Sequence, residues 1–223
     1  MPTSFSIPEP APGAKDATVV TDSGSPMRQR ISDYDWDSTV LGPLTGWHAK
    51  LRVIVELMLD SAEPMVIWWG PERIQIYNDA YGPRVDGAAG SIALGQPAAS
   101  TGKHGWAKIE PLAASVIATG TSKMYTDFAF DIERNGVLQE AYWTYSLTPI
   151  RDQDDVVNGV LMLSGEVTER TISTRRQRTL DLLRSELADV DDFQQLSEAA
   201  ARAAAQNPTD LRMIKLVPHH APA

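Results

Sequence analysis

Cysteine is absent from this chain of 223 residues. Its absence excludes disulfide bonds, thiolate nucleophiles and cysteine-based zinc sites, because each of them needs the cysteine sulfur. A chain without disulfide bonds fits a reducing compartment. We therefore expect a cytoplasmic protein in which neither a thiol nor a zinc–thiolate centre carries the function.

Long apolar runs and an excess of basic residues are lacking as well. The longest apolar runs, such as Met65–Trp69 and Val160–Leu163, fall far short of the ~20 residues that span a bilayer. The first residues lack the basic start and apolar stretch of a secretory signal. The net charge of −9 disfavours sequence-independent binding to nucleic-acid phosphates. Neither a membrane nor a nucleic acid is an expected partner.

Catalytic motifs are also lacking. The stretch that comes closest to a phosphate-binding loop, GQPAASTGKHG, has six residues between Gly95 and Gly102, where that loop has four. His48 lacks the acidic neighbour and the downstream proline of a kinase phosphoacceptor. Spacing suggests no Ser/His/Asp set. We therefore expect that this chain is not an enzyme.

The first part of the chain divides into a polar segment and a helical one. Residues 1–30 contain five prolines among small polar residues, so they bury too little apolar area to offset the entropy of ordering and are predicted to be disordered. Residues 31–62 are predicted to form a cap, with a helix over Leu51–Leu59 from its apolar spacing. Three large apolar residues are expected to anchor the loop before this helix: Trp36, Leu41 and Trp47.

Five strand-like segments follow. Two apolar runs flank Gly70–Arg73, whose Gly-Pro pair predicts a hairpin. After a stretch with helical spacing at 106–119, three more strands are predicted at residues 123–133, 138–152 and 157–167, and Asn135-Gly136 is a hairpin signal between the first two. The order predicts an α+β fold over residues 63–168, a five-stranded antiparallel sheet with helices on one face.

The residues after this unit are predicted to be helical. In the helix expected at 169–190, four apolar residues recur at spacings of 3, 4 and 3, as in a two-stranded coiled coil: Leu180, Leu183, Leu187 and Val190. In residues 191–223 a second helix is opened by Asp191 or Asp192. It is followed by a strand-like run, Leu211–Val217, for which the chain offers no partner strand, so we expect the sequence to be cut short.

Four stretches between about Trp36 and Arg178 carry a resemblance to a known family. In order they are DWDSTVLGPLTGW, YNDAYGP, DIERNG with EAYWTYSLTPIRD, and EVTER. Together they resemble the PAS sensory domain found at the N-terminus of bacterial hybrid histidine kinases. The tail from about Thr179, which includes NPTDLRMIKLV, resembles the start of a GAF domain.

The resemblance implies a sensory or interaction module in two-component signal transduction. It would pass a change caused by a ligand or partner through its C-terminal helix to an output module such as a histidine kinase. Two alternatives stay open. In the first, the chain is the N-terminal fragment of a sensor histidine kinase, which is an ATP-dependent phosphotransferase. In the second, it is a ligand-free scaffold for protein interaction and dimerisation.

Aromatic and polar residues of the predicted sheet and helices are candidates for a ligand pocket: Trp69, Tyr77, Asn78, Trp106, Met124, Trp143 and Tyr145. They have two readings, a half-apolar cavity for a small molecule or packing of a core and a dimer face. Asn78 matches a position typical of PAS domains, where it would bond nearby backbone groups.

The cofactor stays unknown. A flavin adduct of the LOV type is excluded because it requires a cysteine. Haem ligation through His104, the one histidine near the expected pocket, is not favoured, because a lone histidine is more often a solvated or hydrogen-bonding side chain. No other metal site is expected.

The junction between the last strand and the helix is the strongest functional candidate: Glu166, Thr168, Glu169 and Arg170. Thr168 suits the N-cap of the helix and Glu169 suits its positive end, while Glu166 and Arg170 have the spacing of an ion pair. We expect this junction to transmit the signal, although the same residues could simply start a helix. A homodimer is expected through this helix and the segment Trp36–Leu59.

Overall fold

The computed structural model describes residues 25–85, 93–101, 103–134, 137–188, 190–211, 213 and 215. Most of the segment predicted to be disordered lies outside these residues. Its last part does not follow the prediction, because Pro26–Asp33 form helix α1, in which Met27 is buried. Ser25 caps this helix by accepting a hydrogen bond from the amide of Arg28.

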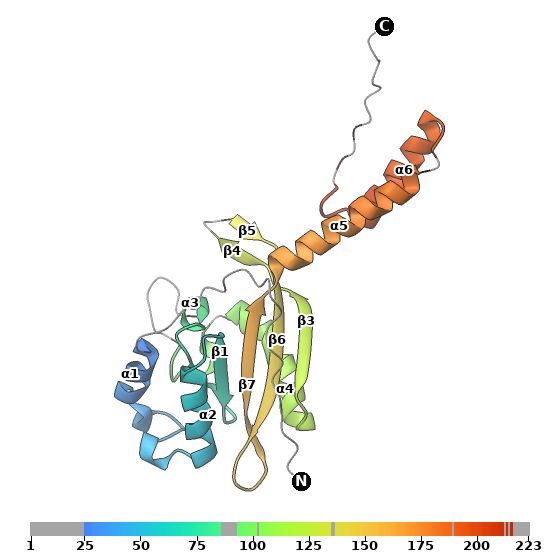
Figure 1. The fold of residues 1–223 in the computed structure, drawn as a ribbon. Coiled ribbons are helices and arrows are strands. Elements are labelled where there is room, and N and C mark those ends of the chain that lie inside the picture. The colour runs from blue at the N-terminus through green and yellow to red at the C-terminus, as the bar shows by residue number, and fades with distance from the viewer. Residues whose placement is uncertain are drawn as a thin grey trace, which may run out of the picture.

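Five strands form one sheet in the order β2-β1-β7-β6-β3, and every neighbouring pair is antiparallel (Figure 1). The strands are β1 (Met65–Trp69), β2 (Ile74–Tyr77), β3 (Lys123–Ala129), β6 (Tyr142–Arg151) and β7 (Val157–Glu166). The prediction of an α+β fold with a five-stranded antiparallel sheet is confirmed.

Local sequence explains why the strands turn where they do. Between β1 and β2, Gly70 and Arg73 have φ angles of +69° and +56°, a left-handed backbone that glycine adopts without steric cost. In β6 the buried side chains alternate with less buried ones, from Trp143 through Tyr145 to Leu147. The polar turn at Asp152 then leads into β7.

The hairpin predicted at Asn135-Gly136 joins two short strands outside the main sheet and not two strands of that sheet. The two turn residues lie outside the described part, but the flanking strands β4 (Ile132–Arg134) and β5 (Val137–Gln139) pair with each other as a separate two-stranded sheet. The register between β3 and β6 shifts after Tyr125, where Asp127 has a φ of +51°. A bulge of this kind bends a strand, and the chain leaves the main sheet before the hairpin.

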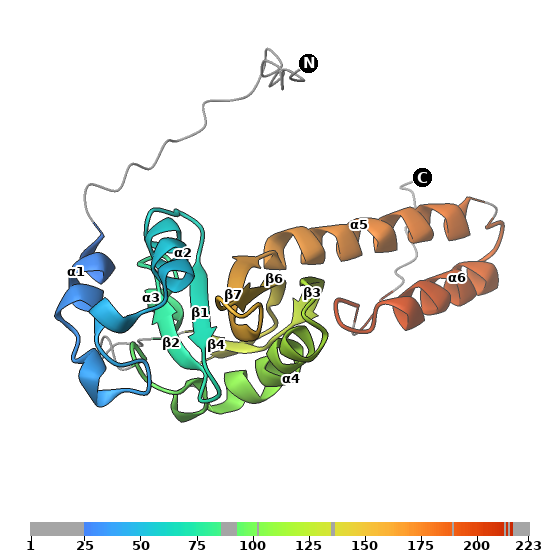
Figure 2. The ribbon, with the colours of Figure 1, turned by 90° about the horizontal axis from the view of Figure 1, so that it is seen from below.

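Helices lie on both sides of the sheet (Figure 2). We call the side that carries α4 (Lys103–Thr119) the inner face; α3 (Gly82–Val85) and a 3₁₀ turn at Ala98–Ser100 border the same side. The N-terminal extension, with α1 and α2 (Ala49–Leu59), packs over β1 and β2 on the outer face. Its loop is held by Trp36 and Trp47, both buried with ring centroids 4.8 Å apart, as predicted.

Asn78 ties this extension to the sheet. Its Nδ2 donates to the carbonyl oxygens of Met58, Ser61 and Glu63, and its Oδ1 accepts from the amides of Met65 and Tyr81. The side chain is almost fully buried. These bonds agree with the predicted backbone role of this asparagine.

Two further helices, α5 (Thr168–Leu187) and α6 (Phe193–Gln206), form a hairpin that projects from one end of the sheet (Figure 1). Three alanines of α6 are buried against α5: Ala199, Ala200 and Ala203. The strand predicted at Leu211–Val217 lies for the most part outside the described residues. Within the described residues, none of the helices combines the length and the apolar content that a membrane span would need.

Candidate functional site

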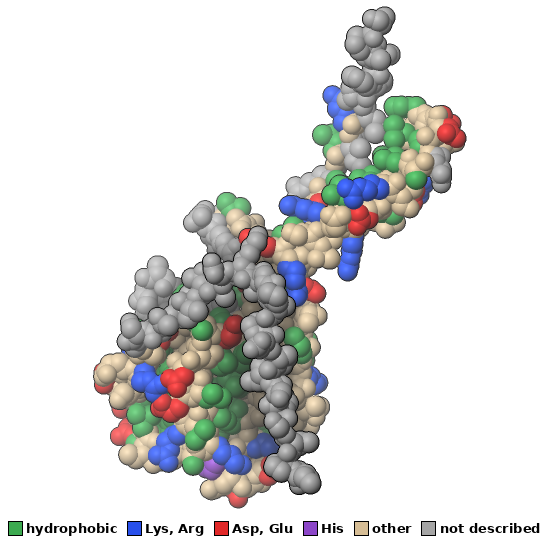
Figure 3. All heavy atoms as spheres, viewed as in Figure 1, with side chains coloured by type: hydrophobic (Ala, Val, Ile, Leu, Met, Phe, Trp, Pro, Cys, Tyr) green, Lys and Arg blue, Asp and Glu red, His purple; other side chains and the backbone are tan. Residues whose placement is uncertain are grey.

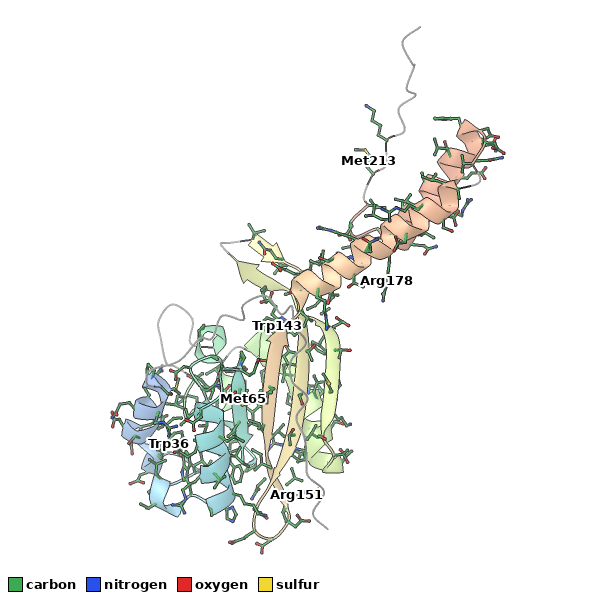
Figure 4. All side chains as sticks on the ribbon, in the orientation of Figure 1. Trp36, Met65, Trp143, Arg151, Arg178 and Met213 are labelled. Carbon is green, nitrogen blue, oxygen red and sulfur yellow. The ribbon has the colours of Figure 1, made fainter. Side chains whose placement is uncertain are left out.

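A cavity of about 490 Å³ lies between the inner face of the sheet and α4, within the range of small-molecule sites. Four aromatic rings supply much of its wall: Trp68, Trp106, Trp143 and Tyr145. The rings of Trp68 and Trp106 meet edge to face with centroids 5.0 Å apart. Trp143 lies near the end of the sheet from which α5 emerges (Figure 4). The walls therefore favour a flat, largely apolar molecule.

A few polar groups interrupt these walls. Gln75 donates from Nε2 to Thr101 Oγ1 over 2.6 Å, and both residues line the cavity with the buried Ser164. Glu166 lies at the solvent-exposed rim. The indole Nε1 of Trp68 is buried and has no hydrogen-bond partner within the described chain. A cavity of this composition can orient a ligand by a small number of hydrogen bonds.

Three of the predicted pocket residues line the cavity, namely Trp106, Trp143 and Tyr145. Tyr77 is buried on the inner face but packs on Tyr81 instead, with ring centroids 5.9 Å apart. Asn78 is occupied by the backbone bonds given above.

The other two predicted pocket residues lie elsewhere. Strand alternation places Trp69 and Met124 on the outer face, and 68% of Met124 is exposed. Trp69 borders a shallow cleft with His48 and Asp152. Trp68, the neighbour of Trp69 in β1, lines the cavity, because successive side chains of a strand point to opposite faces.

At the junction, Thr168 has a different role from the predicted N-cap. The capping position is Val167, which makes no side-chain cap bond, and Thr168 is the first helical residue. The hydroxyl of Thr168 donates to Glu166 Oε1 (2.8 Å) and accepts from the amide of Tyr142 on β6 (2.9 Å). The amide of Val167 donates to the carbonyl oxygen of Tyr142 over 2.7 Å. The start of α5 is thus bonded to the sheet.

The predicted ion pair between Glu166 and Arg170 does not form. Arg170 faces Asp127 on β3 instead, with 3.4 Å between Nη2 and Oδ1. Asp127 also accepts a hydrogen bond of 2.6 Å from Thr171 Oγ1. The bulge that carries Asp127 brings its carboxylate to the first turn of α5, which competes with the i,i+4 pairing. Glu169 is exposed in this turn, and its favourable effect at the positive helix end stays a prediction.

Glu166 belongs to both parts of the site. Its side chain borders the cavity, and Oε1 accepts the hydrogen bond of Thr168. A molecule that enters the cavity therefore reaches the residue that holds the first hydroxyl of α5.

The predicted coiled-coil seam is not the one that α6 covers. Leu180 and Leu187 stay 48% and 38% exposed. The bonds to α6 and the segment after it come from a neighbouring stripe of α5, formed by Arg175, Thr179 and Glu186.

The described residues contain no group of three or more metal-ligating side chains. The side chain of His104 lies outside the described part of the chain.

No protein-family model matches the chain, and no curated protein does. Among solved structures it is similar to a sensory box sensor histidine kinase from Vibrio cholerae, at 15% identity and a TM-score of 0.38 over 54% of this chain and 94% of that one. It is also similar to the PAS domain of Bordetella pertussis BvgS, at 16% identity and a TM-score of 0.37 over 59% of this chain and 97% of that one. A Rhodobacter sphaeroides LOV protein matches at 14% identity and a TM-score of 0.40 over 74% of this chain and 97% of that one. These likenesses are too distant to support a statement about function, which has to come from the residues of this chain.

Proposed function

We propose that the chain is a PAS-type sensory domain that binds a small molecule between its sheet and α4 and passes the change to α5. The four sequence stretches that resemble PAS domains support it, together with the sheet and the cavity. The observation that carries the proposal is the position of Glu166, which borders the cavity and bonds to Thr168 at the start of the helix.

The hydrogen bonds of the Thr168 hydroxyl have a suitable strength for a conformational switch. A hydroxyl that makes two hydrogen bonds contributes about 1–3 kcal/mol. A ligand that prefers one position of Glu166 by that amount shifts the population of α5 conformations, because a ligand shifts an equilibrium by its differential affinity. The signal then leaves through the direction or order of α5.

A second copy of the chain is the proposed partner of the outer face. Val53 and Leu57 on α2 are 67% and 65% exposed, one turn apart on the same side of the helix. Figure 3 shows hydrophobic side chains gathered between α2 and the neighbouring strands. Leu180 and Leu187 on the projecting helix α5 are 48% and 38% exposed, and they are the proposed second contact of the homodimer.

The output module is proposed from the sequence resemblance, which favours a histidine kinase. The likeness of the tail to a GAF domain stays a prediction on the same basis. Absence of catalysis and a cytoplasmic location are likewise proposals from sequence.

The proposal is tested by filling the cavity. In Ser164→Leu a larger side chain occupies the buried polar position on the inner face, and the matched control Ser146→Leu places the same side chain on the outer face of the adjacent strand. Native mass spectrometry of the three purified proteins is expected to show a bound small molecule in the wild type and the control, and its loss in Ser164→Leu.

Thermal unfolding checks that both variants are folded, and Thr101→Leu at the cavity rim serves as a second filling variant. A wild-type protein of bare polypeptide mass after expression in rich medium, with no thermal shift in a metabolite screen, would contradict ligand binding and leave the scaffold alternative.

A further inference from the structure

One arginine joins three separate parts of the chain. Arg175 on α5 donates from Nη2 to Glu140 Oε1 over 2.8 Å and from Nε to Asp210 Oδ2 over 2.8 Å. Its Nη1 also donates to the hydroxyl of Tyr142 over 3.0 Å. Glu140 precedes β6, and Asp210 follows α6, so a single side chain bridges the sheet, α5 and the segment beyond α6.

The cluster is sheltered from solvent. The side chains of Arg175, Glu140 and Asp210 are 23%, 34% and 13% exposed, and charge pairs at such sites are less screened than exposed ones. Both carboxylates receive two bonds from the guanidinium. This paired geometry suits the planar fork of arginine and not the point charge of lysine.

The segment after α6 is fixed to the same place by Asn207. Its buried Nδ2 donates to Thr179 Oγ1 and to Asp210 Oδ2, over 2.8 and 3.0 Å, and its Oδ1 accepts from the amide of Asp210. Thr179 lies one turn after Arg175 and donates to the carbonyl oxygen of that residue. Within the described residues, this polar cluster therefore connects the end of the helical hairpin to Tyr142 of β6 and to Glu140 just before it.

The position of Arg175 on α5 extends the junction at Thr168. The two residues are seven apart, which places them on the same side of a helix with 3.6 residues per turn. Both contact Tyr142, Thr168 at the backbone amide and Arg175 at the phenol oxygen. One residue of β6 is therefore held at two successive points of the output helix.

We propose that Arg175 is the latch that holds the α5–α6 hairpin closed against the end of the sheet. While Glu140 and Asp210 share its guanidinium, α5 keeps one direction and α6 stays folded back along it. Loss of the latch releases the end of α6 from α5 and frees α5 to change direction. The inference rests on the proposed function only in treating α5 as the output helix.

Hydrogen exchange of the full chain tests the latch with a matched pair of variants. Arg175→Met removes the fork, and Arg178→Met makes the same change at an exposed arginine of α5 that forms no hydrogen bond or ion pair with the described residues. Arg178 is labelled on α5 in Figure 4. The amides of Ala199–Ala203 are expected to exchange about tenfold faster in Arg175→Met, because loss of hydrogen bonds to a charged group raises the equilibrium constant for opening by about that factor or more. In Arg178→Met they are expected to exchange at the wild-type rate.

Two further variants keep the test decisive if Arg175→Met folds poorly. Asp210→Asn removes the charge on the α6 side, and Glu140→Gln removes it on the sheet side. Faster exchange in α6 is expected for Asp210→Asn, with strand amides unchanged in both. Equal exchange of Ala199–Ala203 in Arg175→Met, Asp210→Asn and Arg178→Met would overturn the latch. Since no ligand enters this experiment, its failure is separate from a failure of ligand binding.

Discussion

At the residue scale, Asn78 shows how one side chain can fix a junction that the sequence marks only weakly. The side-chain amide bonds to five backbone groups, four of them within residues 58–65 and the fifth at Tyr81. An asparagine amide has two donor hydrogens and one acceptor oxygen, and here both kinds of group are used while buried. This residue stabilises the contact between α2 and the sheet and does not line the cavity.

Replacing Asn78 by alanine is expected to lower the free energy of unfolding by about 3 kcal/mol, because several buried backbone groups lose their partners. Urea denaturation followed by tryptophan fluorescence measures the change. Asn158→Ala is the control, since Asn158 makes a single side-chain bond to Asp152 and should cost less than about 1 kcal/mol. Similar losses in the two variants would argue against the role assigned to Asn78.

Part of the cavity lining could be predicted from the sequence. Trp106, Trp143 and Tyr145 were named from the sequence as aromatic pocket candidates, and all three line the cavity. The partner of Arg170 was not readable, because Asp127 reaches it through a bulge between strands that are far apart in sequence. Trp69 was chosen over Trp68 because sequence alternation alone does not say which face of β1 meets α4.

At the element scale, α5 is the proposed output helix, and two sets of contacts attach it to the sheet. Its first turn is bonded to β3 and β6, and its second anchor is the Arg175 cluster. The hydrogen bonds of Arg175 lower the pKa of Glu140 and hold the pKa of Asp210 well below its usual range, with Asn207 adding to the second effect. Arg176, 3.7 Å from Asp210, adds a weaker attraction.

These pKa shifts give the latch a pH dependence of known sign. A carboxyl group whose pKa is lowered in the folded state stabilises that state fully above its ordinary value of about 4 and loses this contribution as the pH falls through its folded value. Closure should therefore be constant near neutral pH and weaken progressively below about pH 4.

A label pair can follow closure directly, since the chain has no native cysteine to interfere. With spin labels at Thr148→Cys on β6 and Ala201→Cys on α6, both exposed, the distance distribution should be narrow near neutral pH and broaden on acidification. In Arg175→Met it should be broad at every pH. A wild-type distribution that stays narrow after both carboxylates are protonated would show that another contact keeps the hairpin closed.

Element boundaries were largely predictable because Gly, Pro and polar turns separate the strands. The path of α6 was not. The sequence places apolar residues at Leu180, Leu183 and Leu187, and this stripe predicted a coiled coil. Helix α6 of the same chain instead packs small alanines beside polar residues of α5. Such a contact leaves little hydrophobic periodicity in the sequence.

At the scale of the whole molecule, the chain combines an internal cavity, a projecting helical hairpin and exposed apolar side chains on α2. Glu166 and Thr168 connect the cavity to the hairpin, and the exposed Val53 and Leu57 are the proposed contact with a second copy. Burial of the apolar outer surface is the expected driving force of pairing.

A charge on α2 should therefore weaken the dimer. Leu57→Glu is expected to raise the dissociation constant at least about tenfold, because a carboxylate would be buried without a partner. Sedimentation velocity over a concentration series measures it. Ala107→Glu adds the same charge at an exposed site on α4 and should leave the dimer unchanged. Equal sedimentation of both variants and the wild type would remove α2 from the interface.

Hydrogen exchange at residues 168–172 reports whether the inner face of the sheet controls α5 through Thr168. Filling the cavity with Ser164→Leu is expected to change exchange there at least about threefold, and to have no further effect when Thr168→Val has removed the hydroxyl, since coupled residues show non-additive changes. Ser146→Leu should change nothing. Exchange at 168–172 that is unaffected by Ser164→Leu, or affected equally with and without the Thr168 hydroxyl, would show that the cavity does not act on α5 through Thr168.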